Sequence, residues 1–170
     1  MPSGPGMIPE SLIANIAARV PPPVATFLLT SEINPQKIIA QQRRCGTNTL
    51  QLVDHLPCSA HDQIREALPG IKLVQVVHVE NEESVKYAVS VADHVDALLL
   101  DSGTLSGSVK EFGGTGRTHD WNLSRQIRDG VPIPVFLAGG LNSANVAKAI
   151  EAVEPFGIDL CSSVRTNHLL

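Results

Sequence analysis

The feature that most constrains the fold is a regular alternation of short apolar segments with amphipathic ones. The apolar segments are rich in leucine and β-branched residues, which predicts strands over residues 24–30, 49–53, 72–79, 96–101, 133–138 and 157–161. Their starts lie 25, 23, 24, 37 and 24 residues apart. A nearly constant strand-to-strand spacing is typical of right-handed βαβ units and therefore of a parallel sheet.

The segments between the strands carry helix signals. Pro9 and Glu10 predict the start of a helix that precedes the first strand, and a run of three prolines at 21–23 ends it. Other signals are a serine and an aspartate at capping-box spacing, a glycine after a helix, and three asparagine caps: Ser59 and Asp62, Gly46, and Asn34, Asn81 and Asn142. Another helix is predicted over residues 121–129. The sequence therefore predicts an α/β protein that begins with a helix.

Composition agrees with this class. A chain of 170 residues with 43% hydrophobic residues suits one domain over residues 1–170, and only 4% aromatic residues predict an aliphatic core typical of a buried parallel sheet. The net charge of −4 and the scattered Lys and Arg residues argue against a nucleic-acid partner. We find no run long enough for a membrane span and no leader-like segment, so we expect a soluble, cytosolic protein.

Two architectures share this strand–helix pattern, an open doubly wound sheet and a closed (βα)8 barrel. The phosphate signatures GxGxxG and GxxxxGK of open nucleotide-binding sheets are absent from the first βα turns. Glycine pairs instead follow the fourth and fifth strands, and a serine pair follows the sixth. Because phosphate sites after the last two strands are typical of barrels, we favour the barrel.

The fourth strand ends on a carboxylate, Asp101, and opens the longest interval between strands. At a barrel rim, partial burial of Asp101 favours a role as general acid; the alternative is an Asp that caps its own loop. The loop that follows is poor in large apolar residues and contains a glycine-rich segment: Gly113, Gly114, Thr115 and Gly116. Extra residues in a βα loop usually serve a substrate. The alternative is a tolerated surface insertion, which would be favoured in a bland loop, but the GGTG segment makes this loop less bland.

Candidate anion-binding groups follow the last two strands. Gly139 and Gly140 come after the fifth strand, and Ser162 and Ser163 after the sixth. Their N–H groups and hydroxyls suit a phosphate dianion, but a glycine pair alone is more often a tight turn. Asp159 lies within the sixth strand, where it is either a polar contact of the barrel interior or a ligand contact.

Other reactive side chains are interpreted as structural. His55 and His78 end the second and third strands and are expected to be hydrogen-bonded within the fold. The three cysteines, Cys45, Cys58 and Cys161, lie too far apart for a metal-type pairing and are expected to be free thiols that pack as small apolar groups. No metal site is predicted.

Four motifs in sequence order resemble the phosphoribosylanthranilate isomerase family. They are DALLLDS at 96–102, GGTGRTHDW at 113–121, PVFLAGGLN at 134–142 and GIDLCSSV at 157–164. The resemblance implies a (βα)8 barrel of tryptophan biosynthesis that carries out an Amadori rearrangement, an aldose–ketose isomerisation, without a cofactor. It also implies a small phosphoribosyl substrate.

The resemblance also implies roles for individual residues. Asp101 would be the general acid that protonates the ribose ring oxygen and opens the ring. A general base then removes the C2′ proton, and the enolamine tautomerises to the ketose. The residues that would hold the phosphate are Gly139, Gly140, Ser162 and Ser163, and Asp159 would orient the anthranilate end.

The chain also departs from the family pattern. The family's base is a cysteine in a Lys-x-Cys-Gly motif at the end of its first strand, and the 170 residues contain no such motif. The family's first strand, first helix and most or all of the second strand have no match, nor does its last helix, and Ser163 replaces a glycine. The sequence therefore predicts about six of eight strands, an incomplete barrel.

Six parallel strands leave two open sheet edges, which favour self-association or a partner chain. Three hypotheses follow. The chain is the C-terminal portion of an isomerase, with little activity alone; or it is a non-catalytic, phosphosugar-binding partial barrel that needs a partner chain; or it is a phosphate-binding lyase or synthase related by fold. The combination LLLDS, GGTG and HDW argues against the third, because such synthases usually place lysine or glutamate at strand ends.

Overall fold

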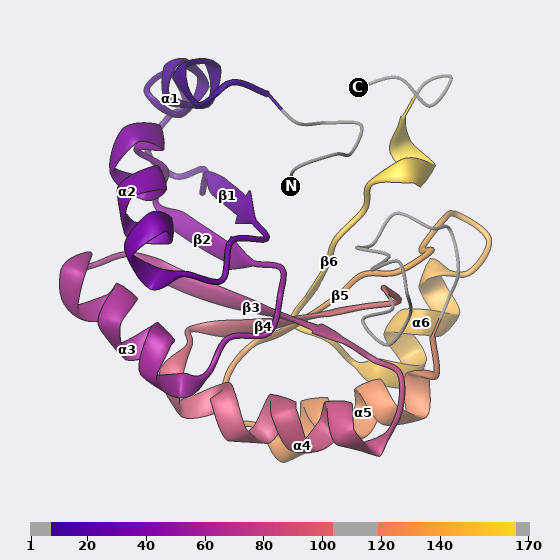
Figure 1. Cartoon of the computed structure of the whole chain (residues 1–170). Helices are drawn as coiled ribbons and strands as arrows, with labels where there is room; N and C mark the ends of the chain where they lie inside the picture. The colour runs from indigo at the N-terminus through magenta and orange to yellow at the C-terminus, as the bar shows by residue number, and fades with distance from the viewer. Residues whose placement is uncertain (1–7, 104–118, 166–170) are drawn as a thin grey trace. The chain divides into compact units, whose positions relative to one another are not determined.

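The computed structural model describes residues 8–103 and 119–165, and Figure 1 labels its elements. The chain divides into two compact units, Met1–Gln75 and Val76–Leu170. Strands alternate with helices in both, and every strand pairing given below is parallel. The predicted α/β class with six strands is confirmed.

The first unit begins with a helix, as the sequence predicts. Its elements are α1 (Glu10–Ala17), β1 (Phe27–Thr30), α2 (Pro35–Cys45), β2 (Thr49–Leu52), α3 (Cys58–Ala67) and the start of β3 (Lys72–His78). In the sheet β2 lies between β1 and β3, so that Leu28 pairs with Leu50 and Leu50 with Leu73. Helix α2 packs beside both α1 and α3.

Helix α2 shows how the sequence sets the boundaries of an element. The Asn34 side chain accepts a hydrogen bond from the Lys37 N–H at 3.1 Å, and Pro35 occupies the first turn, where its missing N–H costs nothing. Gly46 ends the helix at φ 68°, a left-handed conformation that favours glycine. Ile38 and Ile39 face the core and are buried. These predictions are confirmed.

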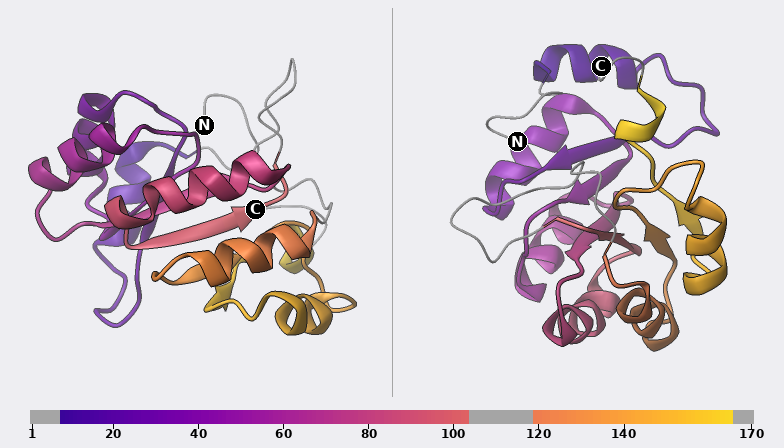
Figure 2. Two further views of the ribbon diagram at one scale, coloured as in Figure 1. Left: turned by 90° about the horizontal axis from the view of Figure 1, so that it is seen from below. Right: turned by 90° about the vertical axis from the view of Figure 1, so that its right-hand side faces the viewer.

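The second unit continues β3 and adds three strands. Its further elements are α4 (Glu82–Val91), the short 3-10 helix η1 (Ala92–His94), β4 (Ala97–Asp101), α5 (Trp121–Gly130), β5 (Val135–Leu137), α6 (Val146–Val153), β6 (Gly157–Ile158) and the 3-10 helix η2 (Ser162–Val164). Strand β5 lies between β4 and β6. Helix α5 packs beside α4 and α6, and Figure 2 shows α4 and α5 running alongside β4.

Several predicted boundaries are wrong. The first and last strands are shorter than predicted, because β1 starts only at Phe27 and β6 ends at Ile158. Ser59 and Asp62 form no cap: α3 starts at Cys58 after Pro57, without a side-chain capping bond. Asn142 instead accepts from the Ala144 N–H in the turn that precedes α6. A polar residue near a helix start does not identify which turn it stabilises.

A buried polar network ties the end of β2 to β3 in the first unit. Gln75 is fully buried, and its amide donates to the carbonyls of Leu52 and Asp54 at 3.0 and 2.9 Å. Its Oε1 lies 2.9 Å from Nε2 of His61, which is also fully buried. Because the Gln75 oxygen can only accept, His61 carries a proton on Nε2.

We expect Gln75→Ala to lower the free energy of unfolding by about 2–3 kcal/mol, because it leaves buried carbonyl and N–H groups without a partner. Urea unfolding followed by circular dichroism measures this change. Gln63→Ala, at an exposed position of α3, is the control and is expected to stay within about 0.5 kcal/mol of the parent. An equal effect of both substitutions would contradict a structural role for the network.

Large apolar side chains are exposed at the terminal strands of both units. On β1, Phe27 and Leu29 are 41% and 48% exposed and alternate with the buried Leu28 and Thr30. On β6, Ile158 is 37% exposed. Among the described residues, β1 pairs with β2 alone and β6 with β5 alone. No helix in the described part of the chain is long and apolar enough to cross a membrane.

Candidate active site

Asp101 ends β4 at the same level as a histidine on the neighbouring strand. The Val79 N–H donates to the Asp101 carbonyl at 2.9 Å. In a parallel ladder this bond pairs Asp101 with the residue before Val79, which is His78. Paired residues of adjacent strands point to one face of the sheet, so His78 and Asp101 share a face.

The same level continues across the next two strands. The Ala138 N–H donates to Leu100 at 2.7 Å, and the Asp159 N–H to Leu137 at 2.9 Å, each one residue beyond the assigned strand pairs. Asp101, Ala138 and Asp159 therefore stand side by side on one face. We call the following residues the site row: His78, Asp101, Ala138 and Asp159. A small residue thus separates the two carboxylates.

The layer beneath the site row is apolar. Leu99 pairs with Phe136, and Phe136 pairs with Gly157. A Cβ on Gly157 would lie 2.9 Å from the Phe136 ring, so only glycine leaves room for the ring at this position. Phe136 also contacts Phe156 edge-on, with ring centroids 5.4 Å apart. The polar row therefore borders an apolar layer, as in most ligand sites.

The Asp101 carboxylate is held by the backbone of the next residue. The Ser102 N–H donates to Asp101 Oδ1 at 2.7 Å, and both residues are half-buried. This is the loop-capping contact that the sequence left open as an alternative to catalysis. It fixes one carboxylate oxygen and leaves Oδ2 for another contact, so the two interpretations are compatible.

Asp159 interacts with Asp101 through space. Its side chain is exposed to solvent, yet desolvation by the atoms around it raises its pKa, and the negative charge of Asp101 raises it further. The backbone N–H of Leu160 opposes both effects. The charge of Asp101, at the same level of the sheet, thus disfavours ionisation of Asp159.

We expect Asp101→Asn to lower the pKa of Asp159 toward its ordinary value, because the variant removes the repelling charge but keeps the desolvation. A carboxyl ¹³C NMR titration measures this pKa. Asp120→Asn is the control, since Asp120 is exposed and does not contribute to the shift of Asp159. An unchanged pKa in the Asp101 variant would show that the two carboxylates do not interact.

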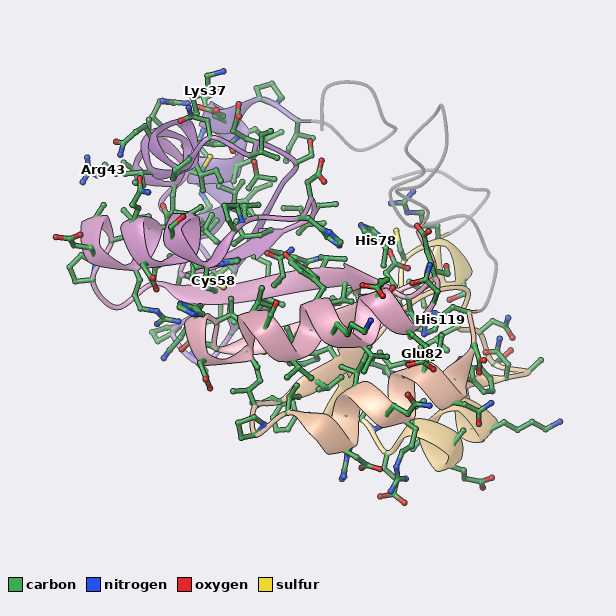
Figure 3. All side chains as sticks on the ribbon, turned by 60° about the horizontal axis from the view of Figure 1, so that its bottom comes forward. Lys37, Arg43, Cys58, His78, Glu82 and His119 are labelled. Carbon is green, nitrogen blue, oxygen red and sulfur yellow. The ribbon has the colours of Figure 1, made fainter. Side chains whose placement is uncertain are left out.

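His119 lies just before α5 (Figure 3) and interacts with the same carboxylate. Its Nε2 is 2.6 Å from Oγ of Ser124, a fully buried residue of α5. Burial lowers the pKa of His119, while the charges of Asp101 and Asp120 act in the opposite direction. Burial therefore favours the uncharged form of the ring, and its buried Nδ1 has no hydrogen-bond partner among the described residues.

The turn after β5 is built on two consecutive glycines. Gly139 and Gly140 have φ angles of 84° and 63°, which favour glycine. The Gly140 carbonyl accepts from the side chains of Asn142 and Asn145 at 3.2 and 3.0 Å. No acceptor for the N–H of Gly139 or Gly140 is found in the described part of the chain. These two N–H groups suit an anion.

The remaining predicted site residues are only partly described. Ser163 is exposed in η2, the short 3-10 helix after β6. The Ser162 side chain and the loop residues Gly113, Gly114, Thr115 and Gly116 lie outside the described residues. In residues 8–103 and 119–165, no group of three or more His, Cys, Asp or Glu side chains is arranged to hold a metal ion.

The sequence left three neighbours of Asp101 without a role at the site: His78, His119 and Ser102. His78 was interpreted as structural, and it accepts at its carbonyl from the Ser84 hydroxyl at 2.9 Å. Only the strand register places it level with Asp101. His119 and Ser102 stand inside two of the motifs, but the spacing of residues along the chain gives no signal that they approach Asp101.

Comparison with known proteins identifies the family. Residues 15–168 match the family described as N-(5'phosphoribosyl)anthranilate (PRA) isomerase. The isomerase of Methanocella arvoryzae is 36% identical over 149 residues, which are 88% of this chain and 68% of that protein. The chain spans 66 to 75% of the length of the curated relatives that it matches.

Solved isomerase structures share the fold. The phosphoribosyl anthranilate isomerase of Thermotoga maritima aligns with a TM-score of 0.77 and 30% identity, over 94% of this chain and 72% of that one. An isomerase in complex with reduced 1-(o-carboxyphenylamino)-1-deoxyribulose 5-phosphate aligns with a TM-score of 0.74 and 28% identity, over 94% and 71%. The predicted barrel family is confirmed. This chain belongs to the phosphoribosylanthranilate isomerase family of tryptophan biosynthesis.

Proposed function

We propose that this chain supplies the acid and phosphate-binding side of phosphoribosylanthranilate isomerisation. Asp101 is the general acid, and the phosphate is held by Gly139 and Gly140 together with Ser162 and Ser163. Asp159 orients the anthranilate end of the substrate. The loop residues Gly113, Gly114, Thr115 and Gly116 serve the substrate. No metal or cofactor takes part.

The observation that carries this proposal is the place of Asp101. It stands at the carboxyl end of β4, and one of its oxygens accepts a hydrogen bond from Ser102. The Gly139–Gly140 turn, with its two N–H groups, follows the adjacent strand β5. Active sites of barrels lie at this end of the strands. The solved relative that binds a reduced carboxyphenylamino-deoxyribulose phosphate supports a phosphoribosyl ligand here.

The chemistry divides into an acid step and a base step. Asp101 gives its proton to the furanose ring oxygen, the bond between that oxygen and C1′ breaks, and the anthranilate nitrogen becomes an iminium. A base then takes the C2′ proton, and the resulting enolamine tautomerises to the ketose. In the family resemblance this base is the cysteine of Lys-x-Cys-Gly. The three cysteines in this chain lie in α2, in α3 and after β6.

The first experiment measures turnover by the loss of phosphoribosylanthranilate fluorescence. We expect little or none with the 170-residue chain alone. A fusion that adds the N-terminal segment implied by the family resemblance, with its Lys-x-Cys-Gly base, is expected to be active. Turnover by the chain alone that Asp101→Asn abolishes would show that the base is within these residues. An inactive but folded fusion would overturn the proposed function.

Exposed apolar side chains on β1 and β6 favour a second candidate function. Phe27 and Leu29 on β1 are 41% and 48% exposed, and Ile158 on β6 is 37% exposed. We infer that these faces bind a partner chain or a second copy, and that a partial barrel binds phosphosugars without turnover. One solved relative is a set of monomers generated from the dimeric Thermotoga maritima isomerase. Size-exclusion chromatography with light scattering tests this; a stable, unaggregated monomer would contradict it.

We also propose that residues 1–170 form a single partial barrel domain and that the protein is cytoplasmic. One family match over residues 15–168 crosses the boundary between the two compact units, which supports a single domain. Three free cysteines suit a reducing compartment. Limited proteolysis tests the first point, since one domain resists cleavage between Gln75 and Val76. Cell fractionation tests the second.

A further inference from the structure

Ser102 connects the proposed general acid to the proposed phosphate turn. Its backbone N–H donates to Asp101 Oδ1 at 2.7 Å. Its hydroxyl is buried and has no hydrogen-bond partner among the described residues. A buried polar group without a partner is unfavourable in a native fold and calls for an explanation.

Other serines in the second unit differ in this respect. The hydroxyl of Ser84 donates to the His78 carbonyl at 2.9 Å, and the hydroxyl of Ser124 lies 2.6 Å from the His119 ring. The exposed Ser90 donates to a carbonyl one turn earlier in α4. Each of these hydroxyls stabilises the fold. The Ser102 hydroxyl makes no such contact with a described residue, and its neighbour is the carboxylate of the site.

Gly139 approaches Ser102 more closely than any other residue type allows. A Cβ on Gly139 would lie 2.8 Å from the Ser102 nitrogen and 2.9 Å from both its Cβ and its Oγ. Because the first of these is a backbone atom, no side-chain rotation relieves the clash. The Gly139–Gly140 turn, whose N–H groups suit an anion, therefore packs closely against Ser102.

The ring oxygen and the phosphate of a phosphoribosyl group lie close together in the molecule. In such a group three atoms, C4′, C5′ and the ester oxygen, separate the ring oxygen from the phosphorus. With its ring oxygen at Asp101 and its phosphate at the Gly139–Gly140 turn, the ester end passes next to Ser102. We propose that the Ser102 hydroxyl is a substrate contact, which donates to the phosphate, while its N–H orients Asp101. The inference rests on the proposed function.

Two serine-to-alanine variants separate a ligand contact from a structural role. Ser102→Ala removes the hydroxyl but keeps the N–H that holds Asp101. We expect it to weaken the binding of inorganic phosphate roughly tenfold or more, the effect of losing a hydrogen bond to a charged group. The urea midpoint is expected not to fall, because the hydroxyl has no hydrogen-bond partner among the described residues. Ser84→Ala, the control, is expected to lower the midpoint and leave phosphate affinity unchanged.

Phosphate affinity is measured by ³¹P NMR titration and stability by urea unfolding, both with the full chain. If Ser102→Ala binds phosphate as the parent does, the inference is wrong and the proposed function stands. If it lowers the urea midpoint as far as Ser84→Ala, the hydroxyl serves the fold and the inference is again wrong. If the parent chain binds no phosphate, the proposed phosphate turn fails and this inference fails with it.

Discussion

Asp101→Asn is expected to reduce turnover of phosphoribosylanthranilate by about 10²- to 10⁴-fold in the fusion that carries the base, because it removes the proton that opens the ring. An asparagine amide has the shape of the carboxyl group, and its oxygen still accepts from the Ser102 N–H. The variant therefore keeps the fold and the binding site. Fluorescence of the substrate measures the rate.

Two controls accompany the Asp101→Asn measurement. Binding of the reduced carboxyphenylamino-deoxyribulose phosphate is expected to stay within a few-fold of the parent, since an amide preserves shape and most contacts. Asp96→Asn changes the same residue type beside the other end of β4, and it is expected to retain full turnover. A variant at Asp101 that kept more than a tenth of the parent rate would exclude this residue as the acid.

Gly139→Ala is expected to abolish phosphate binding and to destabilise the second unit. Two costs combine at this position. The φ angle of 84° is unfavourable for alanine by about 1–2 kcal/mol, and the clash with the Ser102 backbone adds a further overpacking cost of about 1–3 kcal/mol. The turn moves to relieve the clash and carries its N–H donors away from the anion. Urea unfolding and ³¹P NMR titration measure the two effects.

Gly70→Ala is a matched control for this substitution. Gly70 has a nearly identical φ of 86°, but a Cβ there meets nothing within 4 Å. Its substitution is therefore expected to cost only the conformational term, about 1–2 kcal/mol, and to leave phosphate binding unchanged. Equal destabilisation by the two variants would show that contact with Ser102 does not restrain the turn.

The strand–helix order could be predicted because local signals dominate it. Apolar runs bounded by turn residues mark the strands, and an asparagine before a helix caps it at Asn34 and Asn81. The ends of strands were harder to predict, because pairing with neighbouring strands decides how long a strand is. Residues 24–26 and 159–161 have strand-like composition, yet they lie outside β1 and β6. Composition reports an apolar environment, and it does not report the residue at which a strand ends.

Residues of the candidate site could be predicted only where a single sequence motif contains the signal. Asp101 is visible because an apolar run ends on a carboxylate, and the glycine pair is visible because it follows a strand. The relation between Asp101 and Asp159 depends on the register of three strands, and the contact of Gly139 with Ser102 depends on two loops. These relations join residues that are far apart in the chain. The periodicity of the sequence reports only local structure, so it does not predict them.

The course of β3 has a practical consequence for fragment complementation. This strand runs from Lys72 to His78, so the boundary between Gln75 and Val76 falls inside it. A gene cut there would divide one strand between two polypeptides. A cut at Pro69–Gly70, which is exposed and follows α3, keeps the strand whole. The two pieces must then re-form the pairing of Leu52 with Gln75. Burial of the Gln75 side chain therefore reports whether the pieces have reassembled correctly.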